Sequence, residues 1–286
     1  MGEPDYDALL GLAPGAKLKL KDVDPGATPG VADKESAQTQ LKTISKRLSH
    51  LQTLLYAQRK HALLIVLQGT DAAGKDGTVR NAFDAFNPQG VIVTSFKEPT
   101  PVELRHDFLW RVHARAPELG SIAIFNRSHY EEFLVHRAHG ELSDKDAASL
   151  LEEIRNFELL LSRNGVKIVK FFLHISKEEQ LARFGKRLAD SERNWKISES
   201  DYSERAYWEH YQSAYEEAIS ATNGPHAPWR VVPANRKWFR DLATAQITAA
   251  ALESLKMSYP APTVDLADIA RKYHAAAAKD KDGRQG

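Results

Sequence analysis

The stretch that decides the fold is "ALLIVLQGTDAAGKDGT", residues 62–78, where a run of apolar residues passes directly into a glycine-rich loop. Residues 69–75 have the spacing of a phosphate-binding loop (P-loop), in which two glycines precede a lysine. The next residue in that pattern is Ser or Thr, whose hydroxyl holds Mg²⁺, but here it is Asp76. A second carboxylate, Asp71, lies inside the loop. The sequence therefore predicts a phosphate site with two extra acidic groups beside it.

The loop has the flanking context that a phosphate site requires, with an apolar strand before it and a helix-compatible segment after it. Its glycines let backbone N–H groups turn toward an anion, the helix N-terminus adds partial positive charge, and Lys75 adds a full charge. The alternative is a glycine-rich turn with an exposed lysine. We expect the following residues to contact phosphate or nucleotide: Gly69, Ala72, Ala73, Gly74, Asp76, Gly77 and Thr78.

Several roles are open to the two acidic groups. Asp71 and Asp76 can recruit one or two Mg²⁺ ions, or one of them can orient or deprotonate an attacking oxygen. Asp76 also has a simpler explanation, because an acid in the first turn of a helix is favoured by the helix dipole. For Asp71 we favour a cation partner, since an acid among phosphate-facing amides is costly without one.

A second segment bears on the site: "SIAIFNRSHYEEFLVHR", residues 121–137. Its pattern is that of a buried strand ending in polar residues, which in an open α/β sheet point into the ligand crevice. A usual nucleoside triphosphatase has Asp there to hold Mg²⁺, whereas this chain has Asn126, a weaker metal partner. Arg127 follows, and arginine is a natural planar clamp for phosphate oxygens. Weaker candidates, for which salt bridges or other roles remain open, are Arg111, His129, Glu131 and Glu132.

Composition restricts the class of protein. The chain has 286 residues, of which 42% are apolar and 27% charged, as in ordinary globular domains. Without cysteine it can form neither disulfides nor thiolate metal sites. It contains no apolar run of membrane-spanning length, and its start lacks the features of a signal peptide. We therefore expect a soluble, cytoplasmic protein with no membrane partner.

Net charge is only +1, so the chain lacks the global basic field of many proteins that bind nucleic acid. We expect no nucleic-acid partner. Any polyanion must instead meet a local basic patch, and the candidate is "RFGKRLADSERNWK", residues 183–196. The alternative for such a charge run is a solvated helix face.

Strand and helix patterns alternate along most of the chain. Strands are predicted at 63–67, 91–96, 121–125, 166–175 and 229–234. Helices are predicted at 36–60, from a cap at Ser143 to a stop at Gly165, after a capping box at Ser176 and Glu179, at 207–223 and at 238–255. This alternation predicts an α/β fold with a parallel sheet of about five strands, covered on both faces.

The ends of the chain differ from this middle part. Residues 1–35 are rich in Gly, Pro and Asp without sustained periodicity, and predict an N-terminal extension. Residues 36–275 are predicted to form one domain, and residues 276–286 a disordered tail.

Four motifs in order, "GTDAAGKDGT", "FKEPTPVE…FLWR", "IFNRSHYEE" and "KRLADSERNWK", resemble those of the family-2 polyphosphate kinases. The resemblance runs from about residue 36 to about residue 256. It implies a P-loop kinase-like, three-layer α/β/α fold with a helical lid at about residues 183–206. It also implies reversible, Mg²⁺-dependent transfer of phosphoryl groups between inorganic polyphosphate and nucleotides.

Carried over residue by residue, the resemblance makes Gly69–Gly77 the family's first motif, with Asp71 as its acidic catalytic residue and Lys75 as its phosphate lysine. Together with Arg127 these are the expected catalytic residues, and Asp71 and Asp76 are the expected metal ligands. Many members have Asp-Arg-Ser at the second motif, where this chain has Asn126, Arg127 and Ser128. Candidates to line a polyphosphate path in the lid are Arg183, Lys186, Arg187 and Arg193.

Substrate choice is less determined by the motifs. Glu131 stands where other members often carry Asn, as in the subgroup that phosphorylates both AMP and ADP. Adenine nucleotides are therefore the expected partners, with guanine nucleotides left open. Aromatic residues that can stack a purine are Trp110, Trp195, Tyr202 and Trp208.

Two competing functions share these features. One is an ATP-dependent nucleoside monophosphate kinase, and the other is a non-catalytic nucleotide-binding regulator. The basic lid, Asp71 and Arg127 together argue against the regulator, because a binder needs only the loop. The resemblance also suggests a homo-oligomer, which the amphipathic pattern at 36–60 is compatible with but does not decide.

Overall fold

The computed structural model describes residues 4–13, 15–192 and 194–282. At its centre is a five-stranded, all-parallel sheet with the order β2-β3-β1-β4-β5. The strands are β1 (Ala62–Gln68), β2 (Val91–Ser95), β3 (Ile122–Asn126), β4 (Val166–His174) and β5 (Trp229–Pro233). Each lies on its predicted segment, so the predicted α/β class with a parallel sheet is confirmed.

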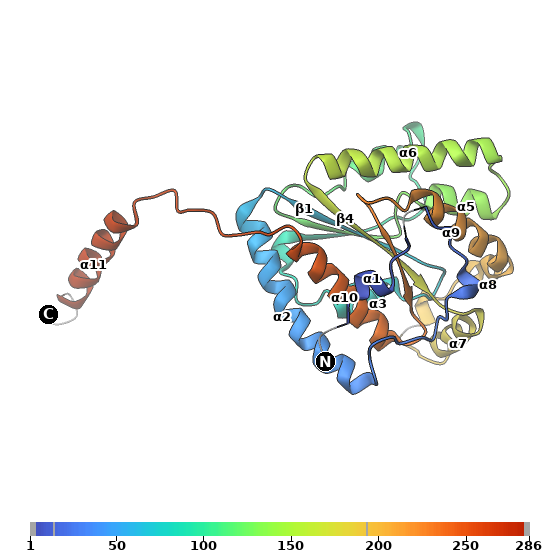
Figure 1. Cartoon of the computed structure of the whole chain (residues 1–286), viewed down its shortest axis with the longest axis horizontal. Coiled ribbons are helices and arrows are strands. Elements are labelled where there is room, and N and C mark those ends of the chain that lie inside the picture. Colours follow the sequence, from blue (N-terminus) through green and yellow to red (C-terminus); the bar gives the residue numbers. More distant parts are fainter. Residues whose placement is uncertain (1–3, 14, 193, 283–286) are drawn as a thin grey trace.

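Helices cover both faces of this sheet, which gives the expected three layers (Figure 1). One face carries α2 (Lys34–Gln58), α3 (Lys75–Ala82) and α10 (Lys237–Glu253). The other carries α5 (Glu131–Ala138), α6 (Asp144–Arg163) and α9 (Trp208–Thr222). No helix in the described part of the chain is long and apolar enough to cross a membrane.

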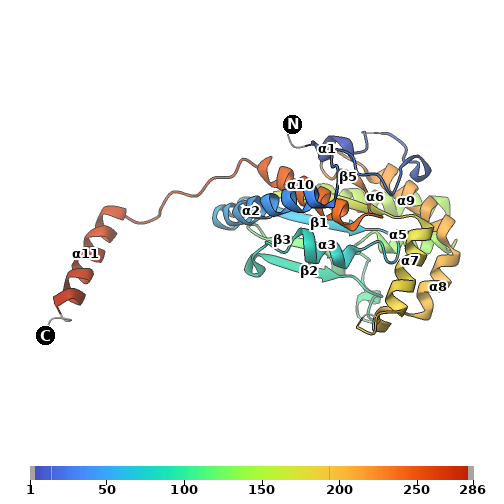
Figure 2. The ribbon, with the colours of Figure 1, turned by 90° about the horizontal axis from the view of Figure 1, so that it is seen from below.

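The remaining elements are short or lie at the ends of the sheet. They are α1 (Tyr6–Leu9), η1 (Leu20–Asp22), η2 (Pro88–Gly90), η3 (Glu103–Arg105), α4 (Trp110–His113), α7 (Lys177–Leu188), η4 (Asn194–Lys196), α8 (Glu199–Ala206) and α11 (Leu266–Asp282). Helices α7 and α8 lie side by side at one end of the molecule in both views (Figures 1 and 2). Because α7 follows β4 directly, this is the end where the strands' carboxyl termini and the P-loop lie.

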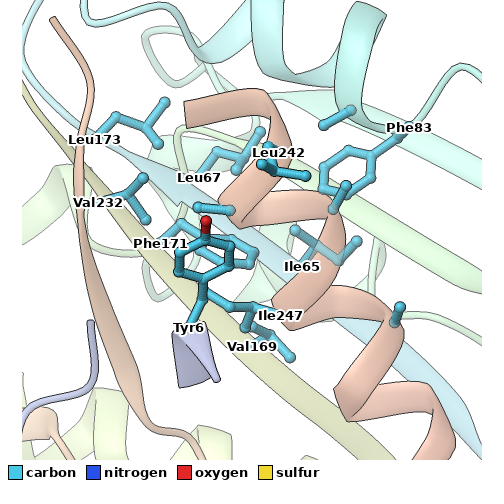
Figure 3. Close-up of a cluster of buried hydrophobic side chains, with 14 of the residues drawn as sticks. Tyr6, Ile65, Leu67, Phe83, Val169, Phe171, Leu173, Val232, Leu242 and Ile247 are labelled. Atoms are coloured by element: carbon cyan, nitrogen blue, oxygen red, sulfur yellow. The ribbon is translucent and has the colours of Figure 1, made fainter. Parts of the chain in front are cut away.

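The central strand explains why two cores form. All seven residues of β1 are buried, and successive side chains point to opposite faces. Leu63, Ile65 and Leu67 pack toward α2 and α10, whereas Leu64 and Val66 pack toward the other face. Figure 3 shows the first of these cores, where side chains from β1, β4, β5 and α10 converge. A continuous apolar run is thus what a strand with helices on both sides requires.

The N-terminal segment lies along the domain rather than projecting from it (Figure 1). Tyr6 is 1% exposed, and its ring meets that of Phe239 edge-on at 5.6 Å between centroids. Gly11 forms an antiparallel bridge to Arg230 at the edge of the sheet. These contacts are scattered over several elements, which is why no single period marks the segment in the sequence.

The C-terminal end differs from its prediction. Residues 276–282, expected to be part of a disordered tail, form the last turns of α11. The alanine-rich sequence there favours helix intrinsically. Helix α11 stands apart from the body of the domain in both views (Figures 1 and 2). Residues 283–286 lie outside the described residues.

Candidate functional site

The P-loop joins β1 to α3 through backbone conformations that few residues adopt. The φ angles are 152° at Gly69, 108° at Gly74 and 60° at Ala72. A Cβ atom at Gly69 would lie 2.8 Å from the carbonyl oxygen of Leu173, so this position requires glycine for space as well as for conformation. A non-glycine residue such as Ala72 costs about 1 kcal/mol or more in the left-handed region, and such strain concentrates at functional loops.

Lys75, the first residue of α3, folds back over the loop. Its ammonium group donates to the carbonyl oxygens of Gly69 at 2.6 Å and Thr70 at 3.3 Å. Burial, followed by the charge of Arg127, lowers the pKa of Lys75 to about 8, although nearby carboxylates oppose the shift. A bound phosphate would offer this lysine charged acceptors, which form stronger hydrogen bonds than carbonyls do.

Arg127 follows β3 and links two acidic residues. Its backbone is left-handed, with φ of 63°, and its N–H donates to the carbonyl oxygen of Leu67 at 3.1 Å. The guanidinium donates to Asp71 Oδ1 at 2.7 Å through Nη2 and to Glu131 Oε2 at 3.1 Å through Nη1. Despite burial, Glu131 and Asp71 raise the pKa of Arg127 further above its ordinary value. Arg127 therefore links Asp71 of the P-loop to Glu131 of α5, so that three predicted residues form one row of ion pairs.

Asp76 and Asn126 form a second contact across the site. The Asn126 side-chain amide donates to Asp76 Oδ1 at 2.8 Å, which ties the first turn of α3 to the end of β3. An aspartate at position 126 would repel Asp76, whereas the neutral amide can donate to it. The Asp-to-Asn departure at the second motif is thus matched by the Asp that replaces Ser or Thr in the P-loop.

A pocket beside the loop is formed by residues of the P-loop, of the turn after β3 and of helices α5, α7, α8 and α9. It is lined by Gly69, Thr70, Asp71, Arg127, Glu131, Leu134, Gln180, Glu204, Arg205, Trp208, Tyr211 and Tyr215. Arg205 donates to Gln180 Oε1 at 2.8 Å, and the Tyr211 hydroxyl donates to Glu204 Oε2 at 2.7 Å. These two hydrogen bonds join α7, α8 and α9, which together form one wall of the pocket.

Most of the pocket-lining residues on α7, α8 and α9 were not predicted from the sequence. Of the aromatic residues among them only Trp208 was named as a candidate to stack a base. Tyr211 and Tyr215 follow it at helical spacing, three and seven residues later, so a search for one aromatic face of α9 would have found them. Gln180 and Arg205 carry no comparable signal, because their place in the pocket depends on how α7 and α8 pack.

Arg183 does not lie where it was predicted. Its side chain is 5% exposed. It donates to the carbonyl oxygens of Ala72 and Ala73, each at 2.8 Å, and to that of Ala234 at 2.6 Å. A guanidinium buried against backbone carbonyls cannot line an open polyphosphate path, so this prediction is wrong. Arg183 supports the P-loop from behind.

Arg240 is a second buried arginine behind the loop, and no pattern in the sequence predicted it. It is 1% exposed and donates to Asp241 Oδ1 at 2.8 Å through Nε. A Cβ atom at Gly74 would overlap its Nη1, and one at Gly77 would lie 3.1 Å from its Nη2. Gly74 is therefore needed to let this arginine approach the loop backbone, and a side chain at Gly77 would make the approach tight.

The other predicted loop and lid residues have mixed positions. Thr78 is fully buried and donates to the carbonyl oxygen of Gly74 at 3.2 Å, so its hydroxyl supports the loop rather than facing a phosphate. On α7, Lys186 is exposed and Arg187 is partly exposed, with its guanidinium 5.8 Å from the centroid of the Phe184 ring. Arg193 lies outside the described residues.

The weaker candidates mostly have structural partners. Arg111 donates to the carbonyl oxygen of Lys97 at 2.8 Å and pairs with Glu103 at 3.5 Å, as the salt-bridge alternative expected. His129 is 2% exposed and therefore faces the core. Among the aromatic candidates, Trp208 lines the pocket. The others do not line it: Trp110, which stacks on His106 at 4.2 Å, Trp195 and Tyr202.

The charge balance of the site suits a divalent cation. Asp71, Asp76 and Glu131 outnumber Lys75 and Arg127, and a phosphate would add further negative charge. Within the described residues, no group of three or more His, Cys, Asp or Glu side chains is placed to hold a metal alone. Mg²⁺ is commonly bound by one or two carboxylates together with substrate phosphates, so the residues present fit such an ion.

The sequence model of "Polyphosphate kinase 2" matches residues 31–260. The chain belongs to this family. Membership confirms the resemblance seen in the motifs, and it makes the protein a phosphotransferase with a P-loop kinase-like fold.

Individual members are similar over most of their length. The AMP/ADP-polyphosphate phosphotransferase of Meiothermus ruber is 45% identical over 250 residues, covering 87% of this chain and 94% of its own. The ADP-polyphosphate phosphotransferase of Rhodopseudomonas palustris is 45% identical over 261 residues, covering 87% and 90%. The crystal structure of polyphosphate kinase 2 from Arthrobacter aurescens superposes with a TM-score of 0.92 at 38% identity, covering 96% and 98%.

Proposed function

We propose that this protein transfers phosphoryl groups reversibly between inorganic polyphosphate and the adenine nucleotides AMP and ADP, with Mg²⁺ as cofactor. The observation that carries the proposal is the row formed by Asp71, Arg127 and Glu131 beside the P-loop lysine. Family membership and the similarity to the AMP/ADP- and ADP-polyphosphate phosphotransferases support the choice of substrates. The alternative function, an ATP-dependent nucleoside monophosphate kinase, is not supported by family membership or by these relatives.

The chemistry asks mainly for positioning and charge neutralisation. Phosphoryl transfer between phosphate oxygens has an anionic nucleophile, so a strong general base is not needed. The P-loop amides and Lys75 would hold the transferring group, and Arg127 would neutralise charge on its oxygens as the bond to the leaving oxygen breaks. Asp71 and Asp76 would hold Mg²⁺, which would offset the negative charge of the phosphate groups.

Arg127 can contact a phosphate without giving up its present partners. A guanidinium has five N–H donors, and the bonds to Asp71 and Glu131 use one hydrogen each of Nη2 and Nη1. The two carboxylates therefore hold the guanidinium in place, and its remaining donors are available to phosphate oxygens.

The exposed basic residues of α7 are the proposed polyphosphate contacts. Polyphosphate carries about one negative charge per unit and has neither base nor sugar, so cationic side chains are the groups best suited to bind the length of the chain beyond the P-loop. Lys186 and Arg187 are placed one turn beyond Arg183, where α7 leaves the loop. We assign them to the polyphosphate path, and we assign the aromatic wall of α9 to the nucleotide.

The first experiment supplies Mg²⁺, long-chain polyphosphate and either AMP or ADP, without ATP, and separates the nucleotide products by chromatography. Product from both acceptors is expected. Lys75→Ala is the control for contaminating kinases, and it should remove turnover without unfolding the protein. Turnover only with ATP as donor would replace this proposal with the nucleoside monophosphate kinase. Guanine nucleotides tested in parallel would define the base preference.

Glu131 is the proposed determinant of AMP use. Glu131→Asn should lower kcat/KM with AMP at least tenfold more than with ADP, because it alters the residue that pairs with Arg127 beside the acceptor. Glu132→Asn is the matched control, since the neighbouring side chain faces His136 at 3.6 Å. Equal losses with both acceptors would remove Glu131 from this role.

A further inference from the structure

A group of charged and polar side chains is completely buried behind the second motif, outside the pocket. Lys170 of β4 and Glu158 of α6 are both 0% exposed, with Nζ and Oε2 2.7 Å apart. Removing two charges from water costs several kcal/mol per ion, and apolar replacements of such pairs are often as stable. Stability alone therefore gives no reason for this pair, and its geometry has to be considered.

Every donor of the lysine is used. Besides Glu158, the ammonium donates to the Tyr130 hydroxyl at 2.8 Å and to the carbonyl oxygen of Thr222 at 3.0 Å. The Tyr130 hydroxyl lies 2.8 Å from both Glu158 Oε1 and Thr222 Oγ1, and donates to one of them at a time. We name these four residues, Tyr130, Glu158, Lys170 and Thr222, the buried cluster.

The histidine of the second motif adds a further contact to this cluster. His129 Nε2 lies 3.2 Å from Glu158 Oε1, and its Nδ1 has no protein partner. Burial lowers the pKa of His129, which makes the neutral ring with its proton on Nε2 the form that donates to Glu158. Glu158 Oε1 thus lies within hydrogen-bond distance of two consecutive motif residues, His129 and Tyr130.

The buried cluster joins the two helices that wall the pocket. Tyr130 immediately precedes α5, which begins with Glu131, and Thr222 is the last residue of α9. The turn between β3 and α5 is held on its other side by Ser128, which accepts from Gln68 at 3.0 Å and from the Tyr130 N–H at 3.2 Å. The turn carries Arg127 in a left-handed conformation, which persists only where the surroundings enforce it.

We propose that the buried cluster consists of positioning residues for phosphoryl transfer. It fixes the turn that presents Arg127 and Glu131, and it sets the distance between this turn and the α9 wall. Directional bonds can do this where apolar packing would leave the turn free to shift. This inference rests on the proposed function for its kinetic part, whereas its structural part is independent of any substrate.

The test uses Tyr130→Phe, which removes one hydroxyl and keeps the ring. Hydrogen exchange of the peptide covering residues 126–134 should rise at least tenfold, because its amides lose the fixed turn. Tyr6→Phe is the matched control: this tyrosine is 1% exposed in the other core, and its hydroxyl has no partner. Unchanged exchange in Tyr130→Phe would overturn the proposal, whatever the substrate is.

The kinetic arm asks whether the effect passes through Arg127. In the wild-type background, Tyr130→Phe should lower kcat about tenfold and change either KM less than twofold. In an Arg127→Lys background, the same substitution should lower kcat less than twofold, because the guanidinium to be positioned is gone. An equal tenfold loss in both backgrounds would indicate general structural damage and refute positioning.

A double substitution is included in case a single substitution in the buried cluster prevents folding. Lys170→Met combined with Glu158→Met keeps the volume roughly constant and leaves no buried charge unpaired. It still removes the partners of the Thr222 carbonyl oxygen and of His129 Nε2, so its melting temperature should fall, but the protein should remain folded. The folded variant should reproduce both the faster exchange and the lower kcat. Full activity in this folded variant would equally overturn the proposal. Absence of polyphosphate transfer by the wild type would refute the proposed function and leave the exchange result to decide on positioning.

Discussion

The lowered pKa of Lys75 makes phosphate binding depend on pH in a defined direction. An anion binds the protonated lysine, and burial lowers the pKa of this group to about 8 in the free protein. Between pH 7 and pH 9 the charged fraction falls from about nine-tenths to about one-tenth, so affinity for a phosphate in the loop should fall about tenfold. Phosphate groups with a second pKa of about 6 are already ionised over this range and contribute little.

Calorimetric titration with methyl phosphate, a monoester whose second pKa is about 6, at pH 7, 8 and 9 and constant ionic strength would measure this dependence. At pH 8 about half a proton should be taken up for each ligand bound, since the bound phosphate raises the lysine pKa again. Comparing two buffers with different ionisation enthalpies gives the proton count directly. Lys75→Arg is the control, because its guanidinium stays charged throughout and should abolish both the uptake and the pH dependence.

Two results would refute this reasoning. Affinity that stays constant from pH 7 to pH 9 would mean that Lys75 remains fully charged in the free protein. The same tenfold fall in Lys75→Arg would assign the titration to another group. Either outcome would mean that the pH dependence of phosphate affinity does not come from protonation of Lys75 as it leaves the two loop carbonyls for the phosphate.

Three further predictions concern the support of the loop and the lid. Gly74→Ala should lower the free energy of unfolding in urea by more than about 2 kcal/mol, because this position has a φ of 108° and a Cβ atom there would overlap Arg240. Gly140→Ala is the control: its φ is 74° but the space around it is open, so it should cost only about 1 kcal/mol. Arg183→Met should lower the free energy of unfolding by about 3 kcal/mol, because it leaves buried carbonyls unpaired. Lys186→Ala, on the exposed surface, should change it by less than about 0.5 kcal/mol. Similar values for the two variants would contradict the role of Arg183 as a buried support of the P-loop. Arg187→Ala should raise KM for polyphosphate and flatten its salt dependence, with KM for nucleotide little changed, and a larger nucleotide effect would mean that α7 faces the other ligand.

The structure also corrects how two arginine positions on one helix were interpreted. Arg183 and Arg187 looked equivalent in the basic segment, yet one is buried against backbone carbonyls and the other is partly exposed. The difference is one turn of α7, which begins against the P-loop and then runs beyond it. Charge counting along a sequence cannot detect this, because burial depends on what lies opposite each turn.

The sequence by itself determined the strand–loop–helix unit, the five parallel strands and the acidic character of the loop. These follow from local patterns: an apolar run such as β1 must be covered on both faces, and a glycine-lysine spacing must bend the backbone around an anion. Tertiary structure alone decided that Arg127 bridges Asp71 and Glu131, that Arg240 lies behind Gly74, and that a buried charge pair holds the second motif. The physical reason is separation along the chain: Asp71 and Arg127 lie 56 residues apart and Lys170 and Tyr130 lie 40 apart, so packing of whole elements sets their contacts.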